Sequence, residues 1–166
     1  MTTIAFTIPV EPHGEGRGRA VTVGKGSRAT ARIITPPATR RWRRQFAQLA
    51  APHRPYEPYP LGTALAVDVT AVFARPAYAS RLSKRDGSLL GGHCEGRYPH
   101  TAKPDADNVA KAVLDALSDW WGDDAQVADL NVSKRVAALG EGPCVCVRIT
   151  PIRQTPENPE GTDAQR

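Results

Sequence analysis

The chain has 166 residues, a length that fits one domain with a single hydrophobic core. Hydrophobic residues make up 40% of it, which excludes a fibrous or wholly disordered protein. No apolar run approaches the roughly 20 residues that cross a membrane, and the amino terminus lacks the basic and apolar regions of a secretory signal. We therefore expect a cytoplasmic globular domain over residues 1–153 and a polar, disordered tail over residues 154–166.

The net charge is +5 at pH 7, and the charges are unevenly distributed. No acidic residue occurs between Glu15 and Glu57, whereas residues 105–129 contain seven aspartates and one lysine. A run of like charges is often only a solvated face, but so strong a segregation favours a polyanionic partner such as nucleic acid. The cations of the acid-free stretch are Arg17, Arg19, Lys25, Arg28, Arg32, Arg40, Arg41, Arg43, Arg44 and Arg54.

The first part of the chain predicts two strands and a helix. Residues 3–10 alternate between apolar and polar side chains, as in a half-buried strand, and residues 31–35 predict a short second strand after a glycine- and arginine-rich loop. Residues 39–50 have helical spacing, with Trp42, Phe46 and Leu49 on one side. We interpret Trp42 as a core anchor rather than as a surface for base stacking.

The second part of the chain predicts three further strands and a second helix. Residues 65–73 alternate most regularly, whereas residues 79–100 lack an apolar period and predict a long loop. The second helix covers residues 108–117, with Asp107 at its N-cap, Gly122 as a stop signal and Val109, Val113 and Leu117 on its buried side.

Residues 130–136 and 144–149 predict the last two strands, joined as a hairpin across residues 140–143. This order of elements predicts a single compact domain of the α/β (α+β) class. One mixed β-sheet would carry two or more helices packed on it.

The segment before the second predicted helix reads Lys103-Pro104-Asp105-Ala106-Asp107-Asn108. Pro104 favours extended backbone before it, and in an extended segment Asp105 and Asp107 point the same way. Carboxylates held together repel each other unless a cation neutralises them, and hard cations such as Mg²⁺ prefer carboxylate oxygens. The positive end of the helix favours phosphate oxygens, and Lys111, one turn further on, could contact a phosphate.

A purely structural interpretation of the same residues stays open. Asp107 can serve as a helix cap, Asp105 as a turn residue, and Lys111 as an ion-pair partner of Asp107 or Asp115. Calcium-loop and Walker motifs are excluded, because their required glycine, glutamate or lysine positions are absent.

A zinc site is a further alternative, but the spacing of its ligands matches no zinc motif, so we interpret the cysteines as reduced thiols. Its ligands would be drawn from His93, Cys94, His100, Cys144 and Cys146.

Four motif elements follow one another in a fixed order: residues 103–108, Lys111, residues 114–117 (Leu-Asp-Ala-Leu) and residues 123–127 (Asp-Asp-Ala-Gln-Val). In this order they resemble the RusA family of Holliday-junction resolvases of bacteria and their phages. The resemblance extends over about residues 4–150 and includes the strand of residues 65–73 and Lys134 in the strand that follows the acidic pair.

This resemblance implies a homodimeric, Mg²⁺-dependent endodeoxyribonuclease, with Mn²⁺ as a substitute metal, that nicks branched DNA symmetrically during recombination and repair. It implies that Asp105, Asp107 and Asp124 bind the metal and act in catalysis, with Asp123 as a neighbouring ligand and Lys111 as the essential lysine. Together with the charge distribution, it implies DNA binding by Arg17, Arg19, Lys25, Arg28, Arg40, Arg41, Arg43, Arg44 and Lys134.

The position of Asp124 raises a geometric question. A single straight helix over residues 108–121 would separate its ends by roughly 20 Å at about 1.5 Å per residue, too far for Asp107 and Asp124 to share a metal. Either the helix ends near Leu117 and the chain turns back, which we favour, or Asp124 serves the site of a partner subunit.

Two other functions stay open from the sequence. One is a non-catalytic protein that binds branched DNA and keeps a vestigial acidic cluster. The other is a metal-dependent hydrolase of small nucleotides, which the long basic stretch disfavours.

Overall fold

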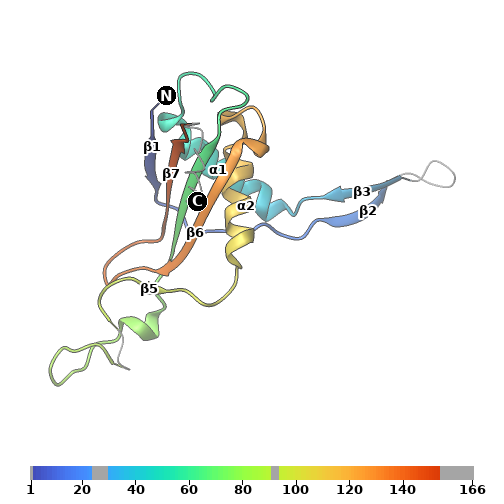
Figure 1. Ribbon diagram of the computed structural model, residues 1–166. Coiled ribbons are helices and arrows are strands. Elements are labelled where there is room, and N and C mark those ends of the chain that lie inside the picture. Colours follow the sequence, from blue (N-terminus) through green and yellow to red (C-terminus); the bar gives the residue numbers. More distant parts are fainter. Residues whose placement is uncertain (1, 24–29, 91–93, 154–166) are drawn as a thin grey trace, which may run out of the picture.

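The computed structural model describes residues 2–23, 30–90 and 94–153. Lys25, Arg28, His93 and the predicted tail from residue 154 therefore lie outside the described residues. Within these ranges no helix has both the length and the apolar character needed to cross a membrane. The architecture is a five-stranded sheet on which two α-helices pack, with a separate two-stranded sheet beside it (Figure 1).

The larger sheet has the strand order β1 (Ile4–Ile8), β7 (Cys144–Pro151), β4 (Leu65–Phe73), β6 (Val127–Val136) and β5 (Tyr98–Pro99). β4 and β6 run parallel, and the other neighbouring pairs are antiparallel. Parallel neighbours need a crossover connection, which here contains α2 (Ala106–Ala116). The prediction of an α+β domain with one mixed main sheet is confirmed.

The predicted hairpin between the last two strands is wrong. β6 and β7 do not pair with each other, because β4 lies between them. Leu65, Val67 and Val69 of β4 are at most 1% exposed. A strand with so many buried side chains gains from the central position, where both of its edges are paired.

The core lies between the sheet and the two helices. α1 (Pro37–Ala50) begins two residues earlier than predicted, since proline is well tolerated in the first helical turn. Trp42 and Phe46 are buried as predicted, but Leu49 is 41% exposed, and Thr39 and Ala50 are buried instead. The predicted buried position of Leu49 is therefore wrong: in the last turn of α1 it is Ala50 that packs into the core.

In α2 the predicted buried stripe of Val109, Val113 and Leu117 is confirmed, since all three are fully buried. The helix ends at Ala116, and residues 118–120 form a short 3-10 helix, so Gly122 is not the residue that stops it. The tightening begins at Leu117, whose amide donates to the carbonyls of both Val113 and Leu114.

Two projections leave the body of the domain (Figure 1). The first, here called the hairpin arm, pairs β2 (Arg19–Val23) with β3 (Thr30–Ile34). The second, here called the insert arm, comprises the described residues 74–90 and 94–97 between β4 and β5. The sequence predicted only the second strand of the hairpin arm. The first strand, β2, shows no burial pattern because its described side chains face no core, and Val21 is 40% exposed.

Candidate active site

Asp105 and Asp107 lie at the amino-terminal end of α2. Asp105 occupies the N-cap, and its carbonyl accepts the first helical hydrogen bond from the amide of Val109 at 3.1 Å. Its side chain makes no capping hydrogen bond, and both aspartates are exposed. The positive end of the helix dipole stabilises negative charge at this place.

The prediction of Asp107 as the N-cap is wrong, because the helix begins one residue before it, at Ala106. Asp107 lies in the first turn of α2, so the alternation argument for an extended segment does not apply to it. Lys111 lies one turn further along the same helix and is exposed.

The segment that leads into Asp105 is held by Lys134 of β6. The Lys134 ammonium donates to the carbonyl oxygens of Ala102 at 2.7 Å and of Pro104 at 2.6 Å. These two carbonyls flank Lys103, whose peptide bond to Pro104 is cis. The backbone of this segment continues the edge of the sheet, since the amide of His100 donates to the carbonyl of Lys134. Lys134 thus contacts protein carbonyls next to the candidate metal ligand.

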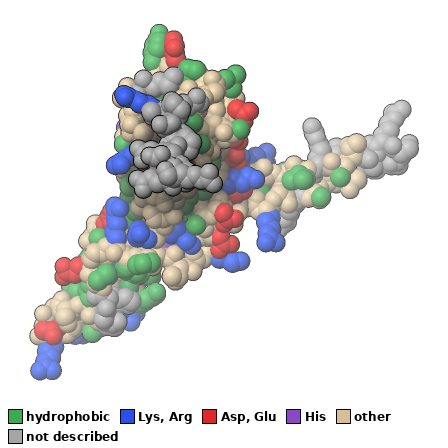
Figure 2. All heavy atoms as spheres, viewed as in Figure 1, with side chains coloured by type: hydrophobic (Ala, Val, Ile, Leu, Met, Phe, Trp, Pro, Cys, Tyr) green, Lys and Arg blue, Asp and Glu red, His purple; other side chains and the backbone are tan. Residues whose placement is uncertain are grey.

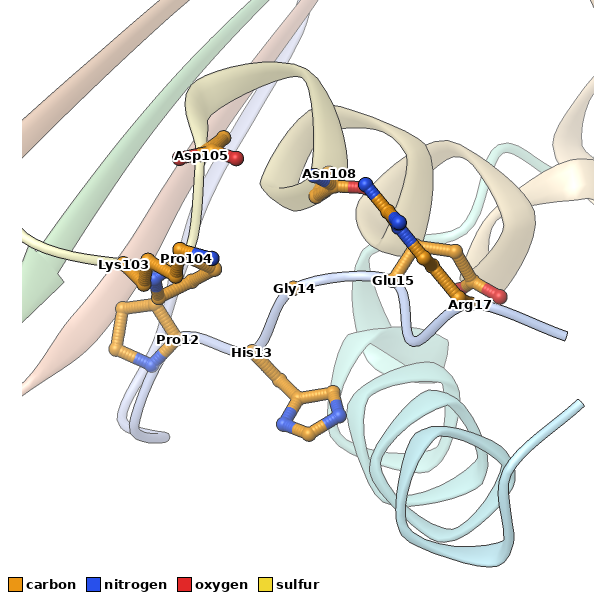
Figure 3. A pocket seen from close by; sticks show the side chains of 9 residues that line it. All are labelled: Pro12, His13, Gly14, Glu15, Arg17, Lys103, Pro104, Asp105 and Asn108. Carbon is orange, nitrogen blue, oxygen red and sulfur yellow. The ribbon is translucent and has the colours of Figure 1, made fainter.

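A cavity of about 670 Å³ lies between the start of α2 and the segment that leads to the hairpin arm. In Figure 3 Asp105 lies at the start of α2, and the chain that carries Glu15 and Arg17 runs beside this helix. The ring of His13 points away from Asp105 toward α1, where its Nε2 lies 3.3 Å from Thr39 Oγ1. The cavity is lined by Pro12, His13, Gly14, Glu15, Arg17, Lys103, Pro104, Asp105 and Asn108.

Gly14 allows this segment to approach α2 closely. A Cβ atom at this position would lie 2.4 Å from Pro104 Cβ, closer than any side chain tolerates. The contact is fixed by the amide of Glu15, which donates to the carbonyl of Asn108 at 2.7 Å. Gly16 and Gly18 of the same glycine- and arginine-rich loop are also close to other side chains, so this loop serves close packing.

Arg43 joins three elements at the side of this cavity. Its guanidinium pairs with Glu15 at 2.5 Å and also pairs with Asp115 of α2. All three side chains are at most 24% exposed. Arg43, predicted to bind DNA, therefore lies in an internal ion-pair cluster, and sequence analysis missed Glu15, whose only signal is its place at the border of the acid-free stretch.

Asp123 and Asp124 lie at the opposite end of α2. The Asp123 carboxylate accepts a hydrogen bond from the amide of Ala125 at 2.9 Å, and Asp124 accepts one from Trp121 Nε1 at 3.1 Å. The buried Gln126 completes the turn by donating to the carbonyls of Pro60 and Thr63. This turn precedes β6, whose other end carries Lys134 and the segment before Asp105.

The separation of the two acidic groups follows from the lengths of these elements. The 11 residues of α2 span about 16 Å at about 1.5 Å per residue, and the 10 residues of β6 span about 33 Å at about 3.3 Å per residue. Within the described ranges no three His, Cys, Asp or Glu side chains come together in a metal-binding arrangement. Asp105 and Asp107 therefore lie at one end of the domain, and Asp123 and Asp124 at the other.

The other predicted DNA-binding residues occupy two places. Arg40, Arg41 and Arg44 are exposed on α1. Arg17 lines the cavity beside Asp105, and Arg19 begins β2 of the hairpin arm.

Comparison with known proteins identifies the family of this chain. Residues 9–150 match the family described as endodeoxyribonuclease RusA, a range that includes every described residue of the site. The chain is also 33% identical over 135 residues to uncharacterized protein YqaN of Bacillus subtilis (strain 168), covering 81% of this chain and 88% of that protein. The chain belongs to the RusA family of endodeoxyribonucleases.

Proposed function

We propose that the protein is a Mg²⁺-dependent endonuclease that resolves four-way DNA junctions by symmetric nicking. The observation that carries this proposal is the meeting of opposite charges at the start of α2. Asp105 shares one cavity with Arg17 and Lys103, so ligands for a cation and partners for phosphates lie together. In a member of a DNA endonuclease family, this combination supports phosphodiester hydrolysis.

The donor set fits Mg²⁺, which proteins usually hold through one or two carboxylates and several waters. Asp105 and Asp107 would provide the carboxylates, and the side chain of Asp105 is not engaged in helix capping. When bound, Mg²⁺ would activate a water and neutralise charge on the leaving oxygen. Lys111 and the amides at the start of α2 would stabilise the negative charge of the scissile phosphate.

We further propose that Asp124 acts in the site of a second copy of the chain. The helix ends at Ala116, as one of the two arrangements considered from the sequence requires, but Asp124 remains a helix length away from Asp105. A carboxylate this distant cannot bind the same ion, because ligands lie about 2 Å from Mg²⁺. A two-fold axis would bring a partner's Asp124 to the site and leave two equivalent sites for two strands.

The free edge of β6 offers a way to build such a dimer. One edge of β6 pairs with β4, and the other edge pairs with β5 only at Val136 and Arg135. Among the described residues, the outer edge of residues 127–133 has no strand partner. Unpaired strand edges favour pairing with another chain.

Antiparallel pairing of this edge with its own copy would centre on Leu130, which is 46% exposed. Residue 124 of one copy would then lie beside the end of β5 of the other, which already occupies this edge at Arg135 and Val136. Val136 pairs with Tyr98 of β5, and the chain continues from there toward Asp105. This register supports the placement of Asp124 in the partner's site.

The test of the proposed function is incubation of the protein with a synthetic four-way junction or a linear duplex, in Mg²⁺ or in EDTA. We expect paired nicks in the junction in Mg²⁺ only. A protein that binds the junction without cutting it in Mg²⁺ would be a non-catalytic branched-DNA-binding protein, and the proposal would be wrong.

Asp107→Asn tests the assigned role of the first-turn aspartate. We expect junction cutting to fall at least about 100-fold, the scale of one preorganised electrostatic contact, while junction binding in EDTA persists. Asp119→Asn, an exposed aspartate near the other end of the helix, is the control and should cut normally. Loss of binding together with cutting would show that Asp107 is structural.

A further inference from the structure

The insert arm has a rigid base. The guanidinium of Arg75 donates to the carbonyl of Ala79 at 3.1 Å, to that of Cys94 at 2.5 Å and to that of Ala137 at 3.2 Å. It also lies 5.4 Å from the centre of the Tyr98 ring. One side chain thus joins both limbs of the arm to the residue that follows β6.

A second set of contacts fixes the returning limb. Arg97 Nε donates to both carboxylate oxygens of Glu141, at 3.0 and 2.9 Å, and this bond lowers the pKa of Glu141 to about 2. The amide of Leu139 donates to the carbonyl of Glu95 at 2.7 Å. Hydrogen bonds at the base of the arm, rather than packing in the hydrophobic core, therefore fix the orientation of the arm.

The outer part of the arm is closed by its own hydrogen bonds. The amide of Leu90 donates to the carbonyl of Arg81 at 2.9 Å, and the amide of Ser83 donates to the carbonyl of Ser88 at 2.7 Å. Gly87 provides the positive φ of 73° that the turn requires. A defined hairpin turn, rather than a loose loop, carries the side chains at the end of the arm.

These side chains are cationic and apolar. Arg81, Lys84 and Arg85 are exposed, and Leu82 and Leu90 are 53% and 47% exposed. Asp86 is the one acidic residue of the sequence between residues 75 and 90, and its carboxylate accepts hydrogen bonds from Ser88 within the turn. Figure 2 shows basic side chains at the far end of this projection and hydrophobic ones along it.

We propose that the insert arm is a second DNA-binding surface. Lys84 and Arg85 would bind backbone phosphates of a duplex that extends from the cleavage site, with Leu82 and Leu90 against its sugars. Charge complementarity identifies the partner as a polyanion, and the position identifies it as the substrate. The arm leaves the sheet after β4 and returns through β5 to the segment that holds Asp105, at the end of the domain that carries the site.

This inference rests on the proposed function, because the duplex is that of the junction being cut. The hairpin arm and the insert arm leave the domain in different directions (Figure 1). DNA held by both would therefore be contacted on two sides of Asp105. A branched substrate can satisfy both surfaces, so we expect the insert arm to contribute to the preference for junctions over linear duplex.

The test compares two double variants of equal charge change. Lys84→Ala with Arg85→Ala removes two exposed cations from the end of the insert arm. Arg148→Ala with Arg153→Ala removes two exposed cations elsewhere, one on β7 and one shortly after it. Affinities of both variants in EDTA are measured for a four-way junction and for a linear duplex over a range of salt concentrations. All four side chains are exposed, so both variants should retain the wild-type melting temperature.

We expect the arm variant to lose roughly 10- to 30-fold in junction affinity at 0.15 M salt, on the order of two phosphate contacts, and its salt slope to fall by about two. Its loss on linear duplex should be smaller. Equal losses in the two variants, or an unchanged salt slope, would overturn the proposal. Because binding is measured without Mg²⁺, this result is independent of whether the wild-type protein cuts junctions.

Discussion

At the amino-terminal end of α2, Asp105 and Asp107 are exposed and Asp105 makes no capping hydrogen bond, whereas at the other end Asp123 and Asp124 are each held by a neighbouring group. The first end adjoins a cavity that Arg17 and Lys103 help to line, and the second adjoins the buried indole rings of Trp120 and Trp121. The two pairs of aspartates therefore differ in how freely their side chains can move. The side chains of Asp105 and Asp107 can reorient toward a bound ion. The side chain of Asp124 is oriented by the Trp121 indole N–H, which would suit a ligand for the site of a second subunit.

The largest expected effect comes from mixing two inactive variants, Asp105→Asn and Asp124→Asn. If each site combines Asp105 of one subunit with Asp124 of the partner, a mixed dimer has one site with both substitutions and one site with neither. We therefore expect the mixture to nick junctions, although each variant alone does not.

The control is a mixture of Asp105→Asn with Asp107→Asn, two variants of the same end of α2. In this mixed dimer each of the two sites carries one of the lesions and no site is intact, so the mixture should stay inactive. If the first mixture is inactive as well, while subunit exchange is verified by a tagged copy, Asp124 does not act across the dimer.

The next effect concerns the open end alone. Lys134→Met removes the ammonium that holds the carbonyls of Ala102 and Pro104 and leaves the segment before Asp105 less constrained. Contacts of this outer kind affect metal affinity about 10- to 100-fold, so we expect the Mg²⁺ concentration for half-maximal cutting to rise about tenfold. In the Lys134→Arg variant this Mg²⁺ concentration should rise less, because a cation is retained.

Junction binding in EDTA distinguishes this role from the DNA contact expected from the sequence. A positioning lysine leaves the affinity and its salt dependence almost unchanged. A phosphate contact lowers the salt slope by about one when it is removed, and that outcome would return Lys134 to the DNA-binding set.

A smaller effect is expected for the contact that links the hairpin arm to α2. Arg43→Met leaves the carboxylates of Glu15 and Asp115 half-buried without their shared cation. We expect the free energy of unfolding to fall by about 1–3 kcal/mol, because an unpaired, partly buried charge is costly. Thermal or urea unfolding measures it.

The neighbouring Arg44→Met is the matched control, since Arg44 is exposed on the same helix. Its stability should change by less than about 0.5 kcal/mol. The affinity for the junction should show the opposite order: at a temperature at which both variants are folded, the Arg44 variant should bind the junction more weakly than the Arg43 variant. Equal stabilities would contradict the internal role of Arg43.

The smallest effect is a pH dependence from His100. Burial, with the charge of Lys134 nearby, lowers the pKa of His100 below its ordinary value, and its ring stacks on Phe73 with 4.0 Å between ring centres. The folded state therefore favours the neutral ring. Stability from this group is present above the unfolded pKa of about 6.5 and is lost as the pH falls below it.

The measurement is the free energy of unfolding between pH 5 and pH 8 for the wild-type protein and for His100→Gln. Between about pH 6.5 and pH 5 we expect the free energy of unfolding to decline less steeply in the His100→Gln variant than in the wild-type protein. Parallel curves would show that His100 does not titrate differently in the two states.

The sequence predicts most elements whose side chains are buried on one face. The alternation in residues 65–73 and the stripe of Val109, Val113 and Leu117 are local patterns, and both match the structure. The strand order is not local: β4 takes the centre, where both of its edges are paired, and a turn-like sequence at residues 140–143 does not reveal this. β2 escaped prediction because its side chains have no core to face.

The site shows the same division. Motif spacing indicates Asp105, Asp107 and Lys111 as candidates, and the structure places them at the N-cap and in the first two turns of α2. It does not reveal that β6 carries Lys134 back to the segment before Asp105, or that the same strand separates this segment from Asp124. These relations depend on the direction of β6 beside β4, a property of the whole sheet.

The contact between Gly14 and Pro104 has a consequence for how this protein can change over evolutionary time. The proline ring cannot rotate away as a flexible side chain would, so every substitution of Gly14 must move either the base of the hairpin arm or the start of α2. Mutational tolerance should therefore be low at this half-buried loop position and higher at the exposed positions of both arms. New substrate preferences can accumulate in the arms while the join beneath them stays unchanged.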